Sequence, residues 1–274
     1  MTEARRNAVL AQWRAGGATV GGWLSIGSPF AAEVMAHAGF DWLCLDLQHG
    51  PIDQGQATAM LQAIGTTPTV PLVRVPWNDP AAIMRWLDAG AGGVVVPLVN
   101  DREQAERAVA ACRYPPEGSR SSGAYRAMLA WGTEYQRSAN DEVACIVMIE
   151  TAEALANLDA ILSTPGVDAV YVGPADLAYG VGLEPGSDDP RLAEAIERVL
   201  DAARRHGVAS GIHTNSAAQT AEYLRMGFQM VTLGSDRGFM RSRAESELAA
   251  AREAAGVAPL DVTASAPGAP LVGD

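Results

Sequence analysis

Lysine is absent from this sequence, because all 20 basic residues among its 274 are arginines. Without a lysine amine, the chain cannot form the Schiff base through which many enzymes activate a carbonyl compound. Carbanion chemistry in this protein would therefore need a metal ion as its electron sink.

Cysteine is scarce. The three thiols, Cys44, Cys112 and Cys145, are odd in number and irregularly spaced. They fit neither a zinc site nor a disulfide framework, so we expect reduced thiols in a cytoplasmic protein.

Long apolar runs and excess positive charge are also missing. No segment approaches the roughly 20 apolar residues that span a bilayer, and residues 1–14 lack the apolar core of a signal peptide. The net charge of −12 argues against nucleic acid and anionic membranes as partners, because both attract basic side chains. An anionic small molecule stays possible, because a local arginine or metal can outweigh the overall charge.

Short apolar runs alternate with helix-period segments along the chain. The runs are nearly continuously apolar, as expected of parallel strands buried on both faces. They cover residues 20–26, 42–46, 71–75, 93–97, 145–150, 169–172, 209–213 and 230–234. The helical segments cover residues 29–37, 54–64, 79–89, 101–112, 151–162, 190–206, 216–226 and 241–255.

Eight strands alternating with helices predict a (β/α)8 TIM barrel, which commonly takes about 250 residues. We predict one barrel domain over residues 1–256 and a disordered tail, rich in Ala, Pro and Gly, over residues 257–274. The alternative is a doubly wound open sheet. A sheet of that kind is expected to carry a G-x-G-x-x-G phosphate-binding loop after the first strand, and the sequence has none there.

Two carboxylates, Glu150 and Asp176, lie at or just beyond the ends of successive predicted strands. In a βα barrel, catalysis takes place where the C-terminal strand ends meet. Two such acids can hold one hard divalent cation and leave most of its coordination sphere open. Asp176 alone fits a helix N-cap equally well, so the pair of acids carries the metal interpretation.

Further polar side chains belong to the same predicted face. Asp46, Gln48 and His49 follow the second strand, and Arg74 lies in the third. His49 also fits a turn residue, and Arg74 also fits a plain ion pair. Their joint occurrence with the two acids favours a catalytic site, whereas His213 at the end of the seventh strand fits a structural histidine better.

Six short motifs occur in order between about residues 18 and 234. They are residues 39–51 (GFDWLCLDLQHGP), 73–80 (VRVPWNDP), 87–91 (LDAGA), 113–120 (RYPPEGSR), 149–151 (IET) and 173–177 (GPADL). Together they resemble the HpcH/HpaI aldolase family. The resemblance implies a metal-dependent class II pyruvate aldolase, such as the 4-hydroxy-2-oxoheptanedioate aldolases of aromatic catabolism. It also implies a hexamer, a trimer of dimers, with exchanged C-terminal helices.

Position by position, the resemblance implies roles for residues of this sequence. Glu150 and Asp176 match the metal ligands, usually for Mg²⁺, Mn²⁺ or Co²⁺. His49 matches the general acid/base, and Asp88 matches the acid that orients His49 and raises its basicity. Arg74 matches the residue that stabilises the oxyanion. The implied substrate-binding residues are Arg74, Met148, Gly173, Pro174, Ala175 and Asp176, and Asp46 and Gln48 stand just outside the metal ligands.

The implied chemistry is a reversible retro-aldol cleavage of a 4-hydroxy-2-oxo acid to pyruvate, or an analogue such as hydroxypyruvate, and an aldehyde. The cation and Arg74 stabilise the enolate of the 2-oxo acid. His49 takes the proton from the C4 hydroxyl in the cleavage direction. Small-molecule partners, a 2-oxo acid and an aldehyde, are therefore expected.

Three departures from the family's pattern bear on the substrate. Gln48 stands where the family often has Glu, which removes a negative charge near the metal. Met148 stands where a Gln often contacts the carbonyl region of the substrate, and residues 121–123 replace a glycine-rich version of their loop. We expect this loop, between the fourth and fifth strands, to form part of the active-site rim.

Two other functions stay open. One is a lyase for CoA thioesters, from the citrate-lyase-like branch. Such an enzyme would need a basic patch to bind the CoA phosphates, and the acidic composition of this chain gives no sign of one. A catalytically silent barrel is the other alternative. The presence of Glu150, Asp176, His49 and Arg74 together counts against it.

Overall fold

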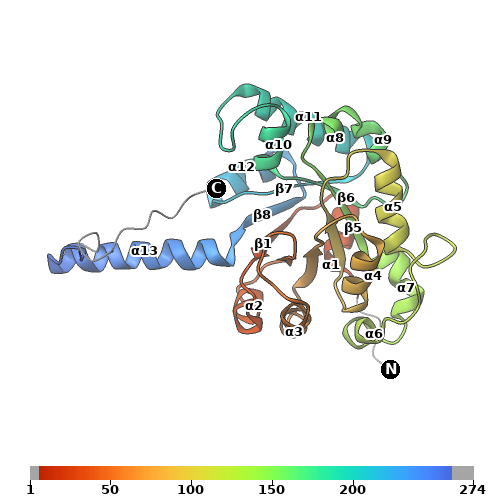
Figure 1. Cartoon of the computed structure of the whole chain (residues 1–274), viewed down its shortest axis with the longest axis horizontal. Helices are drawn as coiled ribbons and strands as arrows, with labels where there is room; N and C mark the ends of the chain where they lie inside the picture. The colour runs from red at the N-terminus through yellow and green to blue at the C-terminus, as the bar shows by residue number, and fades with distance from the viewer. Residues whose placement is uncertain (1–5, 261–274) are drawn as a thin grey trace, which may run out of the picture. The chain divides into compact units, whose positions relative to one another are not determined.

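A closed barrel of parallel strands forms the core of the protein (Figure 1). The computed structural model describes residues 6–260. Its strands are β1 (Thr19–Leu24), β2 (Trp42–Asp46), β3 (Val70–Arg74), β4 (Gly93–Val96), β5 (Ala144–Ile149), β6 (Ala169–Val172), β7 (Ala209–Ile212) and β8 (Met230–Ser235). Each strand pairs with the next, and β8 pairs with β1. The predicted (β/α)8 barrel is therefore confirmed, and the doubly wound sheet is excluded.

Helices follow the strands around the barrel. They are α1 (Ala8–Arg14), α2 (Pro29–Ala36), α3 (Gln54–Ile64), α4 (Pro80–Asp88), α5 (Arg102–Cys112), α6 (Tyr125–Trp131), α7 (Tyr135–Glu142), α8 (Ala152–Ala156), α9 (Leu158–Leu162), α10 (Pro174–Gly180), α11 (Pro190–His206), α12 (Ala217–Met226) and α13 (Asp236–Ala255). The predicted helix 151–162 is divided at Asn157 into α8 and α9. The sequence patterns did not predict the short helices α1, α6, α7 and α10.

Local signals explain where the main helices begin. Asp53 accepts the backbone N–H of Gln56, and the Gln56 side chain bonds back to the Asp53 N–H, which makes a capping box at α3. Asp79 and Asp189 cap α4 and α11, each with a proline in the first turn. These caps satisfy N–H groups that have no partner inside the helix.

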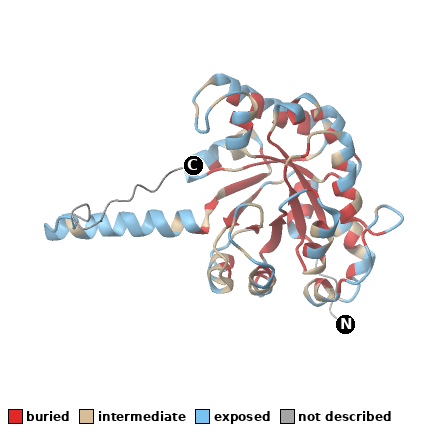
Figure 2. Cartoon of the chain, in the orientation of Figure 1, coloured by how far each residue is buried: buried red, intermediate tan, exposed pale blue. Residues whose placement is uncertain are grey.

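The strands are buried on both faces, as Figure 2 shows by the buried colour of the barrel interior. Every residue of β2 to β7 is buried. Trp42 fills the space beside β1, where a Cβ on Gly21 would lie 2.0 Å from its ring. A side chain at position 21 would thus displace a fully buried indole.

The two ends of the barrel carry different segments, because the helices run back against the strands. Residues just after strands lie at the C-terminal end, and residues just after helices lie at the N-terminal end. The segment after α5 bonds back to it, with Ser119 N donating to Ala110 O and Arg120 N to Arg113 O at 2.8 and 2.9 Å. The prediction that this loop forms the active-site rim of its own chain is therefore wrong, because the loop follows a helix and not a strand.

The C-terminal residues form a compact unit of their own. The contacts within the chain group Met1–Arg237 and Gly238–Asp274 separately, whereas the predicted domain over residues 1–256 had included the last helix. Residues 241–251 of α13 are all exposed in the single chain. Of the predicted tail, residues 257–260 are exposed and form neither helix nor strand, and residues 261–274 lie outside the described part.

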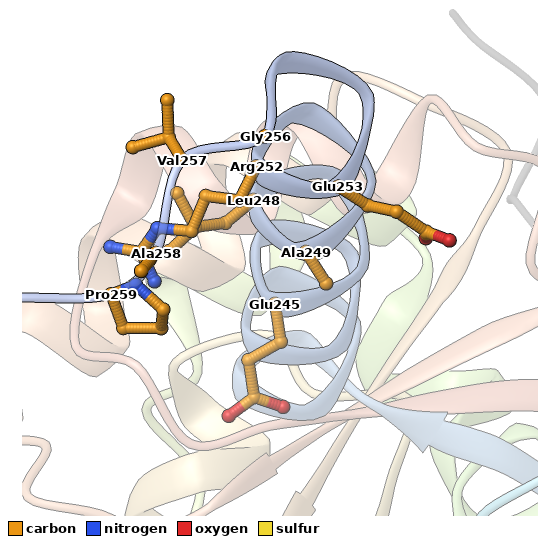
Figure 3. Close-up of a pocket in the computed structure, with 9 residues that line it drawn as sticks. All are labelled: Glu245, Leu248, Ala249, Arg252, Glu253, Gly256, Val257, Ala258 and Pro259. Atoms are coloured by element: carbon orange, nitrogen blue, oxygen red, sulfur yellow. The ribbon is translucent and has the colours of Figure 1, made fainter.

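A hollow of about 600 Å³ lies within this second unit, and Figure 3 shows the residues that line it. It is lined by Glu245, Leu248, Ala249, Arg252, Glu253 and residues 256–259. None of the predicted site residues lines it. No helix in residues 6–260 is both long and apolar enough to cross a membrane.

Candidate active site

Asp46 and Arg74 form a buried ion pair at the C-terminal end of the barrel. The parallel register of β2 and β3 places Asp46 opposite Arg74. Arg74 Nε donates to Asp46 Oδ1 at 3.0 Å, and Nη2 donates to Oδ2 at 2.7 Å. This bidentate geometry fixes the guanidinium plane. The third guanidinium nitrogen, Nη1, has no hydrogen-bond partner among residues 6–260 and is available to a ligand.

The Arg74 charge keeps Asp46 ionised. Burial by itself would raise the pKa of Asp46, but the hydrogen bonds and charge of Arg74 outweigh it, so the pKa is lowered. Asp46 Oδ1 also accepts the backbone N–H groups of Gln48 and His49, each at 3.2 Å. Asp46 thus connects the Arg74 guanidinium to the turn that carries His49.

Glu150 lies directly after β5 and is 2% exposed. Its Oε1 accepts the backbone N–H of Leu98 at 2.8 Å. Its Oε2 is buried and has no hydrogen-bond partner among the described residues. Burial raises the pKa of Glu150, and the charge of Asp176 adds to this effect, while the Leu98 N–H and Arg74 oppose it. A buried carboxylate oxygen without a partner costs free energy unless a ligand satisfies it.

Gly173 keeps space open beside that oxygen. A Cβ at this position would lie 2.9 Å from Glu150 Oε2 and 3.2 Å from Met148 Cε. The Met148 side chain therefore lies near Glu150 and presents an apolar methyl group there. Gly173 has a packing reason to lack a side chain, because any Cβ would crowd the carboxylate.

Asp176 lies in the first turn of α10 and is exposed. The N-cap of α10 is Gly173, so the alternative reading of Asp176 as the N-cap is wrong. Pro174 and Ala175 stand between them, at the start of the helix. Asp176 lies near enough to Glu150 to raise its pKa, and two such carboxylates are the donor type that a hard divalent cation prefers.

The donor set is small. Residues 6–260 contain no group of three or more His, Cys, Asp or Glu side chains placed to hold a metal ion. Two carboxylates leave the other coordination positions to water and substrate, which is the arrangement that catalysis by Mg²⁺ or Mn²⁺ uses. The unpartnered Glu150 Oε2 is the observation that fits a cation here.

His49 and Asp88 are not brought together within the chain. His49 is exposed in the turn after β2, at the C-terminal end. Asp88 is the last residue of α4, at the N-terminal end, where its Oδ1 accepts two hydrogen bonds from Arg120 at 2.7 and 3.3 Å. The expected contact between Asp88 and His49 is therefore missing inside one chain, because the helix carries Asp88 back to the other end of the barrel.

A model of the family described as HpcH/HpaI aldolase/citrate lyase matches residues 19–243. The chain belongs to this family. It is 38% identical over 244 residues to the 4-hydroxy-2-oxo-heptane-1,7-dioate aldolase of Salmonella dublin, with 88% of this chain and 93% of that protein covered. As a family member with aldolase relatives, the protein is a carbon–carbon lyase.

Two solved structures share this fold over most of the chain. The HpcH/HpaI aldolase/citrate lyase family protein from Burkholderia cenocepacia J2315 is 35% identical, with a TM-score of 0.85 over 90% of this chain and 99% of that chain. The citrate synthase SbnG is 27% identical, with a TM-score of 0.82 over 90% of this chain and 98% of that chain.

Sequence patterns alone did not single out an aromatic cluster inside this HpcH/HpaI barrel. The rings of Trp23 and Tyr171 stack at 5.6 Å, and Arg74 lies over the Trp23 ring at 5.1 Å. His213 meets the Trp23 ring edge-on at 5.3 Å and bonds Tyr171 OH through Nδ1 at 3.3 Å. Burial, and next the Arg74 charge, lower the pKa of His213 to about 4. The histidine is therefore neutral near pH 7 and has a hydrogen-bond partner, as the structural interpretation predicts.

Asp236, whose role after the eighth strand the sequence left open between functional and structural, and Leu98, which the sequence did not single out, both make contacts near the strand ends. The Asp236 carboxylate accepts the N–H groups of Ser25 and Ile26 at 3.0 Å and ties the loop after β1 to the end of β8. Its position after a strand was the available signal. Leu98 donates to Glu150 through its backbone, and no sequence pattern marks that contact.

Proposed function

We propose that the protein is a divalent-metal-dependent class II aldolase that cleaves a 4-hydroxy-2-oxo acid to pyruvate, or a pyruvate analogue, and an aldehyde. One observation carries the proposal: within the described part of the chain, the buried Glu150 has one carboxylate oxygen without a hydrogen-bond partner, near the charges of Asp176 and Arg74. The 38% identical relative is named 4-hydroxy-2-oxo-heptane-1,7-dioate aldolase, which supports this substrate class.

Glu150 and Asp176 would hold the cation, which we expect to be Mg²⁺, Mn²⁺ or Co²⁺. A bound cation supplies Lewis-acid stabilisation of the negative charge that develops on a 2-oxo acid. Arg74, oriented by Asp46, adds a hydrogen bond and a positive charge to the same oxyanion. The backbone N–H groups of Ala175 and Asp176, at the start of α10, would receive the carboxylate of the 2-oxo acid.

His49 acts as the general base in the cleavage direction. It accepts the proton of the C4 hydroxyl as the bond between C3 and C4 breaks, and it returns a proton to the alkoxide in synthesis. Its exposure after β2 leaves the imidazole accessible to a substrate. The absence of lysine supports this metal-assisted route, because a Schiff base is not available.

Asp88 keeps its proposed role only if another copy of the chain supplies it, because His49 and Asp88 belong to opposite ends of one barrel. We accordingly propose a homo-oligomer, with a hexamer of exchanged C-terminal helices as the specific form. The apolar side chains of Met240 and Leu248 in α13 are exposed in the single chain, which supports a partner for this helix. Sedimentation equilibrium of the full chain measures the mass and tests this.

The decisive assay is pyruvate release from 4-hydroxy-2-oxoheptanedioate and from shorter 4-hydroxy-2-oxo acids. EDTA-treated protein is compared with and without added Mn²⁺ or Mg²⁺. We expect release that metal restores and that the His49→Ala and Glu150→Ala variants lose. The matched controls are His37→Ala and Glu103→Ala, which alter exposed residues outside the site. Failure of every substrate with every metal would contradict the proposal.

The CoA-thioester lyase is the second candidate, supported by the description of the matching family, which names citrate lyase beside the aldolases. It predicts turnover of a CoA thioester and saturable binding of CoA. Metal binding without turnover of 2-oxo acids or CoA thioesters would instead indicate a catalytically silent barrel. The same substrate panel thus separates the three functions. Participation in aromatic catabolism and a cytoplasmic location are further parts of the proposal.

A further inference from the structure

Leu98 has an unusual backbone conformation. Its φ of 55° makes it the one non-glycine residue with positive φ among residues 6–260. The left-handed region brings Cβ of an L-residue close to the following carbonyl, and branched side chains rarely adopt it. Such conformations persist where the surroundings enforce them, and they occur often at functional sites.

The conformation has a specific consequence for Glu150. The Leu98 N–H donates to Glu150 Oε1 at 2.8 Å, across 52 positions of sequence. Oε1 is thereby engaged, while Oε2 is left without a partner beside Gly173. The backbone of the loop after β4 thus distinguishes two carboxylate oxygens that are chemically equivalent.

The surrounding loop is held on both sides. Val99 is fully buried. Asn100 N donates to Gln104 Oε1 at 2.9 Å, and Asn157 Nδ2 donates to Asn100 O at 2.8 Å. Thr151, which directly follows Glu150, also bonds the Asn100 side chain. These contacts connect the strained residue to the β5–α8 turn and fix the position of its N–H.

We infer that Leu98 is a positioning residue, whose left-handed backbone occupies Glu150 Oε1 so that Oε2 alone is presented to the cation. This inference rests on the proposed function. One-oxygen binding by Glu150 leaves more coordination positions for a chelating 2-oxo acid. It also favours the small octahedral ions Mg²⁺ and Mn²⁺ over Ca²⁺, which accepts bidentate carboxylates and a larger number of oxygens.

Two substitutions separate the backbone from the side chain. Asn adopts the left-handed region readily, whereas the β-branched Val resists it more than Leu does. We expect Leu98→Asn to keep Mn²⁺ affinity within about twofold, and Leu98→Val to weaken it about tenfold or more. Leu98→Val should also reduce the preference for Mn²⁺ over Ca²⁺, because Glu150 Oε1 is then free to bind.

The measurement is calorimetric titration of EDTA-treated protein with Mn²⁺ and, separately, with Ca²⁺. Thermal unfolding of each variant checks that it is folded. If affinity instead follows apolar packing, with Val tolerated and Asn not, the inference is overturned. Leu98→Asn decides this even if Leu98→Val fails to fold.

Glu150→Gln separates this inference from the proposed function. If Glu150→Gln binds Mn²⁺ like the unaltered protein, the proposed metal site itself is wrong. If Glu150→Gln loses binding while both Leu98 variants keep the same affinity and the same preference for Mn²⁺ over Ca²⁺, the role of Leu98 is wrong and the metal site stands.

Discussion

Both ends of the barrel contain a buried arginine paired with an aspartate, but their surroundings differ. At the C-terminal end, Arg74 and Asp46 lie near Glu150, whose second oxygen has no partner. At the N-terminal end, Arg120 is fully buried between two tyrosine rings, donates to Tyr135 OH at 3.0 Å and pairs with Asp88 at 2.7 Å.

Buried polar atoms without a hydrogen-bond partner also differ in number between the two ends of the barrel. Four buried side-chain atoms of the described residues lack a partner: Gln48 Oε1, Asn78 Oδ1, Glu150 Oε2 and Tyr114 OH. The first three follow strands, at the C-terminal end, and Tyr114 is at the other end. Native proteins leave few buried polar groups unpaired, so a concentration of them marks a place where a ligand completes the structure. We therefore expect catalysis at the C-terminal end and a stabilising role for the pair at the N-terminal end.

The largest expected effect is at the C-terminal end. Glu150→Gln removes the buried charge that would hold the cation, so pyruvate release should fall at least about a hundredfold. The same substitution should, by contrast, increase the free energy of unfolding of the metal-free protein. The raised pKa of Glu150 means that the metal-free folded state loses stability as pH rises from the unfolded value of 4.5 through the folded pKa.

Metal-free Glu150→Gln should therefore be more stable than the unaltered protein at pH 7, with the difference vanishing near about pH 4. Urea unfolding at the two pH values, with EDTA present, measures this. A variant that is both inactive and less stable at pH 7 would show instead that the Glu150 carboxylate stabilises the fold.

Arg120→Met tests the N-terminal end. It removes a buried cation from Asp88 and Tyr135, so we expect a loss of about 2–4 kcal/mol of unfolding free energy. Arg107→Met, in the exposed pair with Glu103, is the matched control and should cost less than about 0.5 kcal/mol. Equal midpoints in urea for both variants would contradict the structural role of Arg120.

His213 is expected to make the stability of the folded protein depend on pH. Its pKa is lowered from 6.5 to about 4, chiefly by burial, so the folded state resists protonation. The free energy of unfolding should therefore fall by up to roughly 3 kcal/mol as the pH drops from 6.5 toward 4, because only the unfolded chain takes up the proton in that range. His213→Gln should show a smaller loss between pH 7 and 4.5 in urea unfolding, whereas an unchanged slope would exclude His213 as a source of acid sensitivity.

The smallest expected effect is at Gly173. Gly173→Ala places a methyl group against Glu150 Oε2 and Met148 Cε. We expect Mn²⁺ affinity to fall about tenfold, with little change in thermal midpoint, because the flexible Met148 side chain can move. Gly55→Ala, at an exposed position in α3, is the matched control. Unchanged Mn²⁺ affinity in Gly173→Ala would show that the space beside Oε2 is not used.

Much of the fold was readable from sequence because it depends on local patterns. The apolar runs predicted all eight strands, and capped helices such as α3 and α11 match their predicted bounds. The short helices α6 and α7 were not predicted, because neither has a side-chain N-cap bond. The placement of residues 113–124 was wrong for a different reason, since proline and glycine indicate a loop but not the end of the barrel to which it belongs.

The sequence by itself determined the residue types at the strand ends, and therefore the chemistry available to the site. Asp46, Arg74, Glu150 and Asp176 follow from the strand pattern, because parallel strands in a barrel all end on the same face. Only the tertiary structure decided which oxygen of Glu150 is free, that Asp88 faces Arg120 and not His49, and that Leu98 takes a left-handed backbone. These facts depend on contacts between residues far apart in the chain, such as Leu98 with Glu150, and local propensity carries no information about them.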